Sequence, residues 1–176
     1  MTTNIIITGF GGQGILFAGK ILAYTALVLG KQLSWLPSYG PEMRGGTANC
    51  HVIVSDEPVG SPIIITPDVL ISMNKPSLEK FEGTVRSGGT ILYDKSLIDR
   101  DVARNDVTTV AVDATEIATE DGKAGMANMI MLGAFLKATG LFTLDEIRLG
   151  VEKTVPASKK HLIEVNMEMI EKGYNL

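Results

Sequence analysis

A short stretch near the N-terminus, residues 5–15, constrains the fold more than any other part of the sequence. Ile5, Ile6 and Ile7 are consecutive β-branched apolar residues, which are typical of a buried strand. Several glycines follow at once, and residues 15–23 then begin an apolar helix. A strand, a glycine-rich turn and a helix in this order open a βαβ unit. Glycine lets the backbone approach a ligand closely, and a helix N-terminus carries unpaired N–H groups, so this turn suits a phosphate or a carboxylate.

The spacing Gly9-x-Gly11-x-x-Gly14 matches the fingerprint of dinucleotide-binding proteins. A nicotinamide site also needs an acidic residue about 20 residues further on, where it binds the ribose. Residues 29–37 contain no acid, and Lys31 is interpreted as a solvated residue rather than as a ligand of a 2′-phosphate. The missing acid disfavours NAD. Two other interpretations stay open: a turn that only allows tight packing, and a turn that receives part of a cofactor held by a partner.

A second unusual segment, Pro37–Gly46, contains two prolines and three glycines and is predicted to be an irregular loop. Arg44 could bind a carboxylate or phosphate through two donors, and Glu42 could orient it or accept a proton. Gly45 and Gly46 would allow close approach of a ligand or another chain. The alternative is a stiff connection with a surface ion pair; we favour a functional loop because special backbone and charge coincide. Its aromatic, acidic and basic side chains are Tyr39, Glu42 and Arg44.

The rest of the sequence alternates between strand and helix patterns. The strands predicted after the first cover residues 31–36, 47–55, 59–66, 69–73, 90–94 and 107–112. The predicted helices cover residues 14–29, 77–81, 126–139, 143–154 and 158–172, with another near Asp113. Gly30 and Gly173 are the expected stops of the first and last helix, and Thr143 with Glu146 forms a capping box.

This order predicts an α/β fold, a three-layer Rossmann-like sandwich with a mixed, partly parallel sheet, in one domain over residues 1–176. Ligands of such sheets lie beyond the carboxyl ends of the strands. The turn at residues 11–14 and the loop at residues 38–46 both follow strand ends, but the sequence alone does not place them at the same edge. The helix over residues 126–139 is apolar on every side, so it is either the centre of the fold or half of an interface.

Other reactive side chains have plain structural interpretations. Cys50 occupies an apolar position of a predicted strand, which is typical of a buried small residue rather than a nucleophile. His51 and His161 have no neighbouring serine, cysteine or paired acid that would indicate a triad or a metal site. The acids at predicted strand ends are interpreted as caps or turn formers: Asp68, Asp94 and Asp113.

Composition excludes several classes of function. The chain is 45% hydrophobic and 20% charged, with a net charge of −4, which is typical of a globular protein and does not favour nucleic acid or anionic membrane. A single cysteine excludes an internal disulfide and an all-cysteine iron–sulfur site. No signal peptide or apolar run of about 18 residues is recognisable, so a cytoplasmic protein is expected.

Taken together, the motifs resemble those of a known enzyme family. They are Gly9–Gly14, Pro37–Gly46, Pro67–Asp68, Met73–Ser77, Asn128–Ala134, Val155–Pro156 and Asn166. At this spacing they resemble the gamma subunit of 2-oxoacid:ferredoxin (acceptor) oxidoreductases over almost the whole chain. The segment Pro-Ser-Tyr-Gly-Pro-Glu-x-Arg-Gly-Gly is most similar to the 2-oxoglutarate branch, with the branched-chain 2-oxoacid branch close behind.

The resemblance implies a reaction in which a 2-oxoacid, coenzyme A and oxidised ferredoxin give acyl-CoA, carbon dioxide and reduced ferredoxin. It implies that thiamine diphosphate, magnesium and iron–sulfur clusters belong to partner subunits: alpha, beta and a ferredoxin-like delta. The sequence agrees, because it contains no Gly-Asp-Gly followed by paired asparagines, the thiamine diphosphate/magnesium motif. The chain would then be inactive alone, with no catalytic residue and no metal site of its own, and when isolated it could pair with itself.

The resemblance also implies a role for the two glycine-rich segments: to complete the substrate and coenzyme A cavity over a partner's thiamine ring. The residues expected to line it are Gly11, Gly12, Gln13, Gly14, Tyr39, Glu42, Arg44, Gly45 and Gly46. Two other classes remain as alternatives. One is a freestanding Rossmann-type nucleotide-binding module, and the other is a purely structural assembly subunit.

Overall fold

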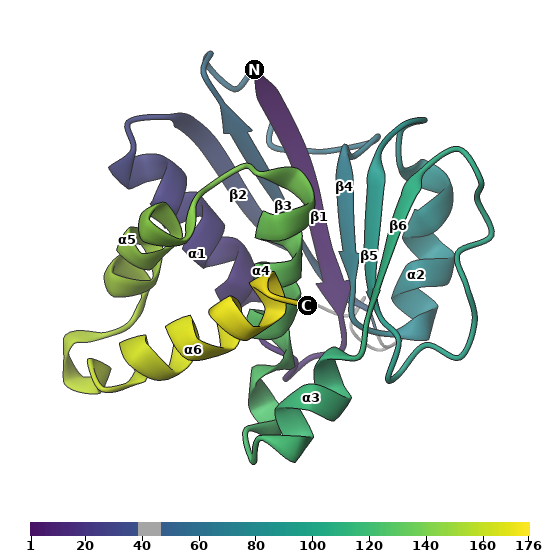
Figure 1. Cartoon of the computed structure of the whole chain (residues 1–176). Helices are drawn as coiled ribbons and strands as arrows, with labels where there is room; N and C mark the ends of the chain where they lie inside the picture. The colour runs from purple at the N-terminus through teal and green to yellow at the C-terminus, as the bar shows by residue number, and fades with distance from the viewer. Residues whose placement is uncertain (39–46) are drawn as a thin grey trace.

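A computed structural model describes residues 1–38 and 47–176, and its central feature is a six-stranded sheet with the order β2-β3-β1-β4-β5-β6 (Figure 1). β4, β5 and β6 run parallel to β1, whereas β3 runs antiparallel to both β1 and β2. The predicted mixed, partly parallel α/β sheet is therefore confirmed. The strands are β1 (Thr2–Gly9), β2 (Gln32–Ser38), β3 (Ala48–Ser55), β4 (Val69–Ser72), β5 (Thr90–Asp94) and β6 (Thr108–Val112).

Helices cover both faces of this sheet, as expected for three layers. α1, α4, α5 and α6 lie together on one face, and α2 lies on the other (Figure 1). α1 packs on α5 and on β3, while α4 packs on α6 and on β5 and β6. The helices are α1 (Ile15–Val28), α2 (Lys75–Phe81), α3 (Ala114–Glu120), α4 (Ala127–Thr139), α5 (Leu144–Thr154) and α6 (Leu162–Tyr174).

β1 is buried on both faces, which explains its unbroken run of isoleucines. Ile5 and Ile7 point into the larger core beneath α1 and α4, and Ile6 points into the smaller core beside Leu70 and Ile91. All three isoleucines are no more than 1% exposed. A strand flanked by neighbours and covered on both faces needs apolar side chains at every position.

α4 forms the centre of the larger core. Of the two interpretations of its apolar sequence, the centre of the fold or half of an interface, the structure supports the first. All ten residues from Ala127 to Leu136 are buried. α4 and α6 approach so closely that a Cβ on Gly173 would lie 1.9 Å from the carbonyl oxygen of Ile130. A Cβ on Gly133 would likewise lie 1.9 Å from the carbonyl oxygen of Ile170. The two helices are therefore in backbone contact at a pair of glycines.

The prediction for the last helix was wrong at both ends. Residues 157–159 form a 3-10 turn, so α6 begins at Leu162 rather than at Ser158. Gly173 lies inside α6 and does not terminate it, because its role is the close contact with α4. By contrast, the predicted stop at Gly30 is confirmed by its positive φ of 72°, and the Thr143–Glu146 capping box is present at the start of α5.

The strand predicted over residues 59–66 was also wrong. The structure has an irregular segment between β3 and β4. Prolines at positions 58, 62 and 67 interrupt this segment, and proline removes a donor from any strand ladder. The β-branched residues that suggested a strand are therefore arranged without a strand partner.

One residue of this segment is fixed to the sheet. Ile64 is 6% exposed and packs in the smaller core, and its N–H donates a hydrogen bond to Nδ1 of His51 at 2.9 Å. His51 lies on β3 and is half-buried, and burial lowers the pKa of its ring from 6.5. The bond requires Nδ1 to be unprotonated, because a protonated nitrogen cannot accept.

Gly173→Ala should lower the free energy of unfolding by about 3 kcal/mol, because the new methyl group would force two packed helices apart. Gly83→Ala is the matched control, since nothing lies within 4 Å of a Cβ there. Urea unfolding of both variants measures the difference. Equal stability of the two variants would contradict the close helix contact.

Acidification should weaken the fold through His51. A pKa below the ordinary 6.5 means that the native state binds the proton less readily than the unfolded state. The stability contributed by the neutral His51 ring is therefore complete above pH 6.5. It decreases as the pH falls below 6.5 and is lost once the pH has fallen through the lowered pKa of the native state. His51→Gln keeps an acceptor but cannot be protonated, so its free energy of unfolding should fall less than that of the wild type between about pH 7 and pH 5. Parallel pH profiles from urea unfolding would disprove this role of His51.

Candidate functional site

The carboxyl ends of the parallel strands bring the sequence motifs to one edge of the sheet. Thr8 of β1 lies beside Ser72 of β4, which lies beside Tyr93 of β5. The glycine-rich turn after β1 is therefore next to the segment that follows β4. Figure 1 shows the β1 arrow ending at this edge, near α3.

The second glycine-rich segment departs from the same edge. Gly9 pairs with Ala48, and Ser38 pairs with Asn49, so both residues that flank the segment, Ser38 and Thr47, lie close to the end of β1 in the sheet register. Sequence alone did not place the two motifs together. Residues 39–46 lie outside the described part of the chain, and with them the predicted site residues Tyr39, Glu42, Arg44, Gly45 and Gly46.

β1 and β4 form the switch point of the sheet. They are parallel neighbours, but the helices that follow them, α1 and α2, lie on opposite faces. In open α/β sheets the crevice at such a point is where ligands bind. The glycine-rich turn occupies this position.

The glycines of the turn are required by backbone geometry. Gly12 and Gly14 have φ of 90° and 72°, a region that side chains rarely adopt. A Cβ on Gly14 would also lie 2.2 Å from Nδ2 of Asn128, and a Cβ on Gly9 would lie 2.5 Å from Oε1 of Gln13. The turn therefore has a single well-defined shape that other residues would not permit.

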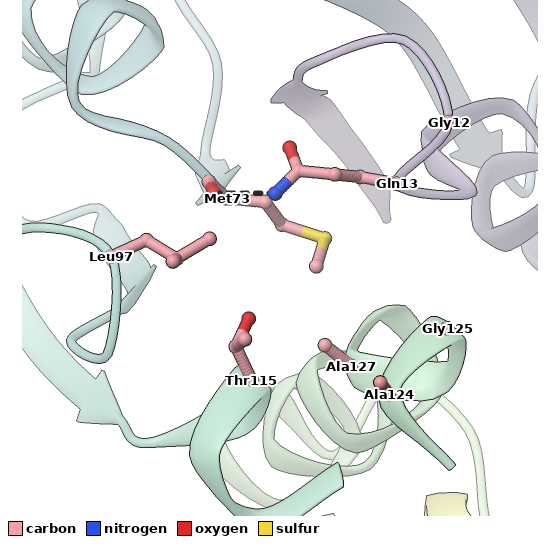
Figure 2. Close-up of a pocket in the computed structure, with 8 residues that line it drawn as sticks. All are labelled: Gly12, Gln13, Met73, Leu97, Thr115, Ala124, Gly125 and Ala127. Carbon is pink, nitrogen blue, oxygen red and sulfur yellow. Dashed lines mark hydrogen bonds between the residues drawn. The ribbon is translucent and has the colours of Figure 1, made fainter. Parts of the chain in front are cut away.

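Gln13 fastens the turn to the neighbouring strand. Its Oε1 accepts a hydrogen bond from the N–H of Phe10 at 2.6 Å, and its Nε2 donates to the carbonyl oxygen of Met73 at 3.0 Å (Figure 2). The side chain thus bridges the ends of β1 and β4. This bridge gives Gln13 a structural role in the site, and direct contact with a ligand stays a prediction.

Asn128 holds the turn from the other side and was not singled out as a site residue by sequence reasoning. It lies in the first turn of α4, is 6% exposed, and its Nδ2 donates to the carbonyl oxygen of Gly14 at 3.1 Å. The available signal was a polar residue at the start of an otherwise apolar run. Asn128 fixes the start of α4 against the start of α1.

A cavity of about 150 Å³ lies beside the turn, and Figure 2 shows its side chains around a common space. None of the lining residues is charged. Met73 and Leu97 approach from the strand side, and Thr115 and Ala127 approach from the helices. The lining residues are Gly12, Gln13, Met73, Leu97, Thr115, Ala124, Gly125 and Ala127.

A second hollow, of about 280 Å³, lies on the other side of the turn. Its lining is mostly apolar and includes the aromatic rings of Phe10 and Phe17. Gly12 lines both hollows, so the glycine-rich turn forms the wall between them. An extended ligand that crosses this wall would meet backbone rather than side chains at Gly12.

The start of α1 is electrostatically suited to an anion. α1 has no acidic residue in its first turn, and its N-cap, Gly14, has no side chain to satisfy the first N–H groups. α5 is a contrast within the same chain, because it has a complete capping box and two acids in its first turn. The N-terminus of α1 therefore retains the partial positive charge that α5 neutralises.

Of the three acids predicted to be caps or turn formers, one, Asp94, acts in this way through its side chain. Asp94 is buried and accepts hydrogen bonds from the N–H of Ser96 and from Thr115. Asp68 lies at the opposite edge, where it accepts from the N–H of Asn4 and pairs with Arg86. Asp113 occupies the N-cap position of α3 without a side-chain capping bond.

Cys50 is not placed to act as a nucleophile, and the described residues group no metal ligands. Cys50 is fully buried, its Sγ donates to the carbonyl oxygen of Ile15, and burial raises the pKa of the thiol to about 12. Among residues 1–38 and 47–176, no three His, Cys, Asp or Glu side chains are grouped to hold a metal ion. In the same residues no helix has the length and hydropathy to cross a membrane.

The fold and the site define an α/β domain of Rossmann-like architecture that presents a glycine-rich turn beside an uncharged cavity. The chain belongs to the pyruvate ferredoxin/flavodoxin oxidoreductase family, whose sequence profile matches residues 4–176. This confirms the family resemblance of the motifs.

Two relatives illustrate how the domain occurs in this family. The ketoisovalerate oxidoreductase subunit VorA of Methanothermobacter marburgensis is 45% identical over 172 residues, which cover 97% of this chain. The chain spans only 35% of the length of that relative. The 2-oxoglutarate synthase subunit KorC of Methanocaldococcus jannaschii is 35% identical over 179 residues, and the match covers 94% of its length.

Solved structures agree with the fold. The gamma subunit of a keto/oxoacid ferredoxin oxidoreductase from Geobacter sulfurreducens is similar with a TM-score of 0.84 at 30% identity, covering 98% of this chain and 96% of that one. The 2-oxoglutarate:ferredoxin oxidoreductase of Magnetococcus marinus, solved with 2-oxoglutarate, coenzyme A and succinyl-CoA bound, is similar with a TM-score of 0.86. At 22% identity that likeness concerns the fold, and it covers 30% of the longer chain.

Substitutions at Gly14 and Asn128 should be energetically coupled. Gly14→Ala should lower the free energy of unfolding by about 1–2 kcal/mol more than Gly12→Ala does. Both substitutions strain the backbone, but only the one at Gly14 also adds a clash with Asn128. The extra cost should shrink in an Asn128→Ala background, since the clashing amide is gone. A double-mutant cycle of urea unfolding measures the coupling, and strictly additive values would exclude the contact.

Proposed function

We propose that the chain is the gamma subunit of a multi-subunit 2-oxoacid:ferredoxin oxidoreductase. The reaction converts a 2-oxoacid and coenzyme A to acyl-CoA and carbon dioxide, and two electrons pass to ferredoxin. Family membership supports the reaction class. The observation that carries the role of this chain is the uncapped N-terminus of α1 at the switch point, with an uncharged cavity beside it.

In this proposal the chain contributes a wall of the coenzyme A and substrate cavity. The phosphates of coenzyme A meet the N–H groups at the start of α1, where Gly11 and Gly12 allow close backbone approach. We further propose that Arg44, with Tyr39 and Glu42, adds side-chain contacts to this ligand. An uncharged part of the ligand occupies the cavity beside Met73 and Leu97, because none of the residues that line this cavity is charged.

The chemistry of the reaction belongs to other subunits. Thiamine diphosphate supplies carbanion stabilisation at the 2-oxoacid carbonyl carbon when it is bound in the complex. The described residues do not fit that cofactor, because they include no cluster of carboxylates for its magnesium ion. The single cysteine, buried under α1, is equally unsuited to an iron–sulfur cluster. The family resemblance implies that alpha, beta and ferredoxin-like delta subunits hold these cofactors, and in this proposal the chain alone is inactive.

Among 2-oxoacids we propose 2-oxoglutarate. KorC proteins match this chain over nearly their whole length at 35% and 32% identity, slightly above the 31% of a pyruvate synthase subunit PorC that is covered to 91%. The VorA match is higher in identity but concerns part of a longer protein. Turnover of the assembled complex with 2-oxoglutarate and with 3-methyl-2-oxobutanoate separates the two substrates.

A freestanding dinucleotide-binding module is the competing hypothesis, because the glycine spacing lies at the switch point. The structure gives it little support, since β2 and the residues before it, from 29 to 38, carry no acid for the ribose. Titration of the purified chain with NAD, NADP and coenzyme A tests it directly. Tight binding of a nicotinamide dinucleotide would favour the module over the subunit.

Arg44→Ala in the assembled complex should raise the KM for coenzyme A about tenfold or more, because a bidentate contact to phosphate is lost. The KM for the 2-oxoacid should change little. Lys31→Ala is the matched control, since Lys31 pairs with Asp56 at the opposite edge of the sheet. Unchanged dependence of turnover on coenzyme A would exclude Arg44 as a clamp.

A further inference from the structure

An exposed apolar segment lies away from the site. Residues 58–67, here named the isoleucine ridge, contain no charged residue and connect β3 to β4. Ile63 is 62% exposed and Ile65 is 81% exposed, whereas Ile64 between them is 6% exposed. The ridge therefore exposes two branched apolar side chains within three residues of the chain, and exposed apolar surface that is contiguous marks an interaction site.

The isoleucine ridge is held in a fixed conformation. Ile64 packs against Ile6 and Ile53 on the sheet face opposite α1, and its N–H is bound by His51. The N–H of Ile63 donates to Oγ of Ser61. Three prolines further restrict the segment. Exposed apolar side chains on a pre-ordered backbone lose little entropy on binding, which favours association.

Two of the three acids at the ends of the ridge are paired within the chain, and the third, Glu57, is exposed directly before it. Asp56, before the ridge, binds Lys31 and the N-terminal amine, both within 2.8 Å. Asp68, after the ridge, pairs with Arg86. A partner that covers the two exposed isoleucines of the ridge therefore meets an apolar strip with one exposed carboxylate, Glu57, at its start, so a mainly apolar surface fits it best.

The relatives indicate what such a partner is. In VorA of Methanothermobacter marburgensis the matching domain makes up 35% of the chain, at 45% identity. In the Magnetococcus marinus structure a domain of the same fold makes up 30% of its chain. In such longer chains the remaining polypeptide is joined to this domain, and its attachment keeps it available to cover an exposed apolar strip.

We propose that the isoleucine ridge is the docking surface for a polypeptide homologous to the remainder of the VorA chain. The inference rests on the proposed function, because it names where a partner of that complex binds. The ridge lies over the middle of β3, whereas the glycine-rich turn follows the end of β1. A partner anchored at the ridge fixes the orientation of the domain and leaves the turn accessible to a ligand.

The test uses the 176-residue chain and the purified polypeptide from the same genome that is homologous to the remainder of VorA. Ile65→Asp should weaken binding at least about tenfold in calorimetry, because it places a charge in an apolar interface. Leu27→Asp is the matched control: Leu27 is 54% exposed, but it lies on α1, on the other face of the sheet, so its binding should equal that of the wild type. Circular dichroism verifies folding, and Ile65→Ala, a milder change, should give an intermediate loss.

The outcomes separate this inference from the proposed function. If the wild type binds and Ile65→Asp binds equally well, the docking surface is elsewhere and the proposed function stands. If the wild type does not bind the partner at all, both the subunit role and the ridge are disproved. If the chain instead self-associates and Ile65→Asp abolishes only that, a second copy covers the ridge and the inference is overturned.

Discussion

The burial of β1 between β3 and β4 is the constraint on which the rest of the structure depends. Because β1 is covered on both faces, its three isoleucines fix its register and its central place in the sheet. That place determines where the chain leaves β1 and therefore where the glycine-rich turn lies. The antiparallel pairing with β3 then brings Ser38 and Thr47, which flank residues 39–46, to the same edge. The site is thus a consequence of how one strand is packed.

Local features of the fold were predictable from the sequence because each has a short-range cause. The apolar run of β1, the positive φ at Gly30 and the capping box of α5 depend on neighbouring residues, and all three are present. The misplaced strand at residues 59–66 also has a local cause, because the prolines at 58, 62 and 67 interrupt it. The misassigned Gly173 has a different cause, since its role depends on the contact with Ile130 of a distant helix.

The candidate site was predictable in part for the same reason. The glycine spacing identified the turn, and the turn has the positive φ angles and the helix N-terminus that the spacing implies. Asn128 lies 114 positions from Gly14 in the sequence, so no local pattern could have connected them. The common edge of the two motifs required the antiparallel register of β3, which hydrophobic patterns do not specify.

The glycine contact between α4 and α6 has a mechanical consequence for the turn. Where two helices touch through their backbones, neither can slide along the other without collision, so α6 sets the axial position of α4. Gly133 follows Asn128 by five residues, a distance of about 7.5 Å along a helix. The C-terminal helix therefore acts as a stop that keeps the amide of Asn128 level with the start of α1. Through this stop, α6 sets the alignment of the glycine-rich turn.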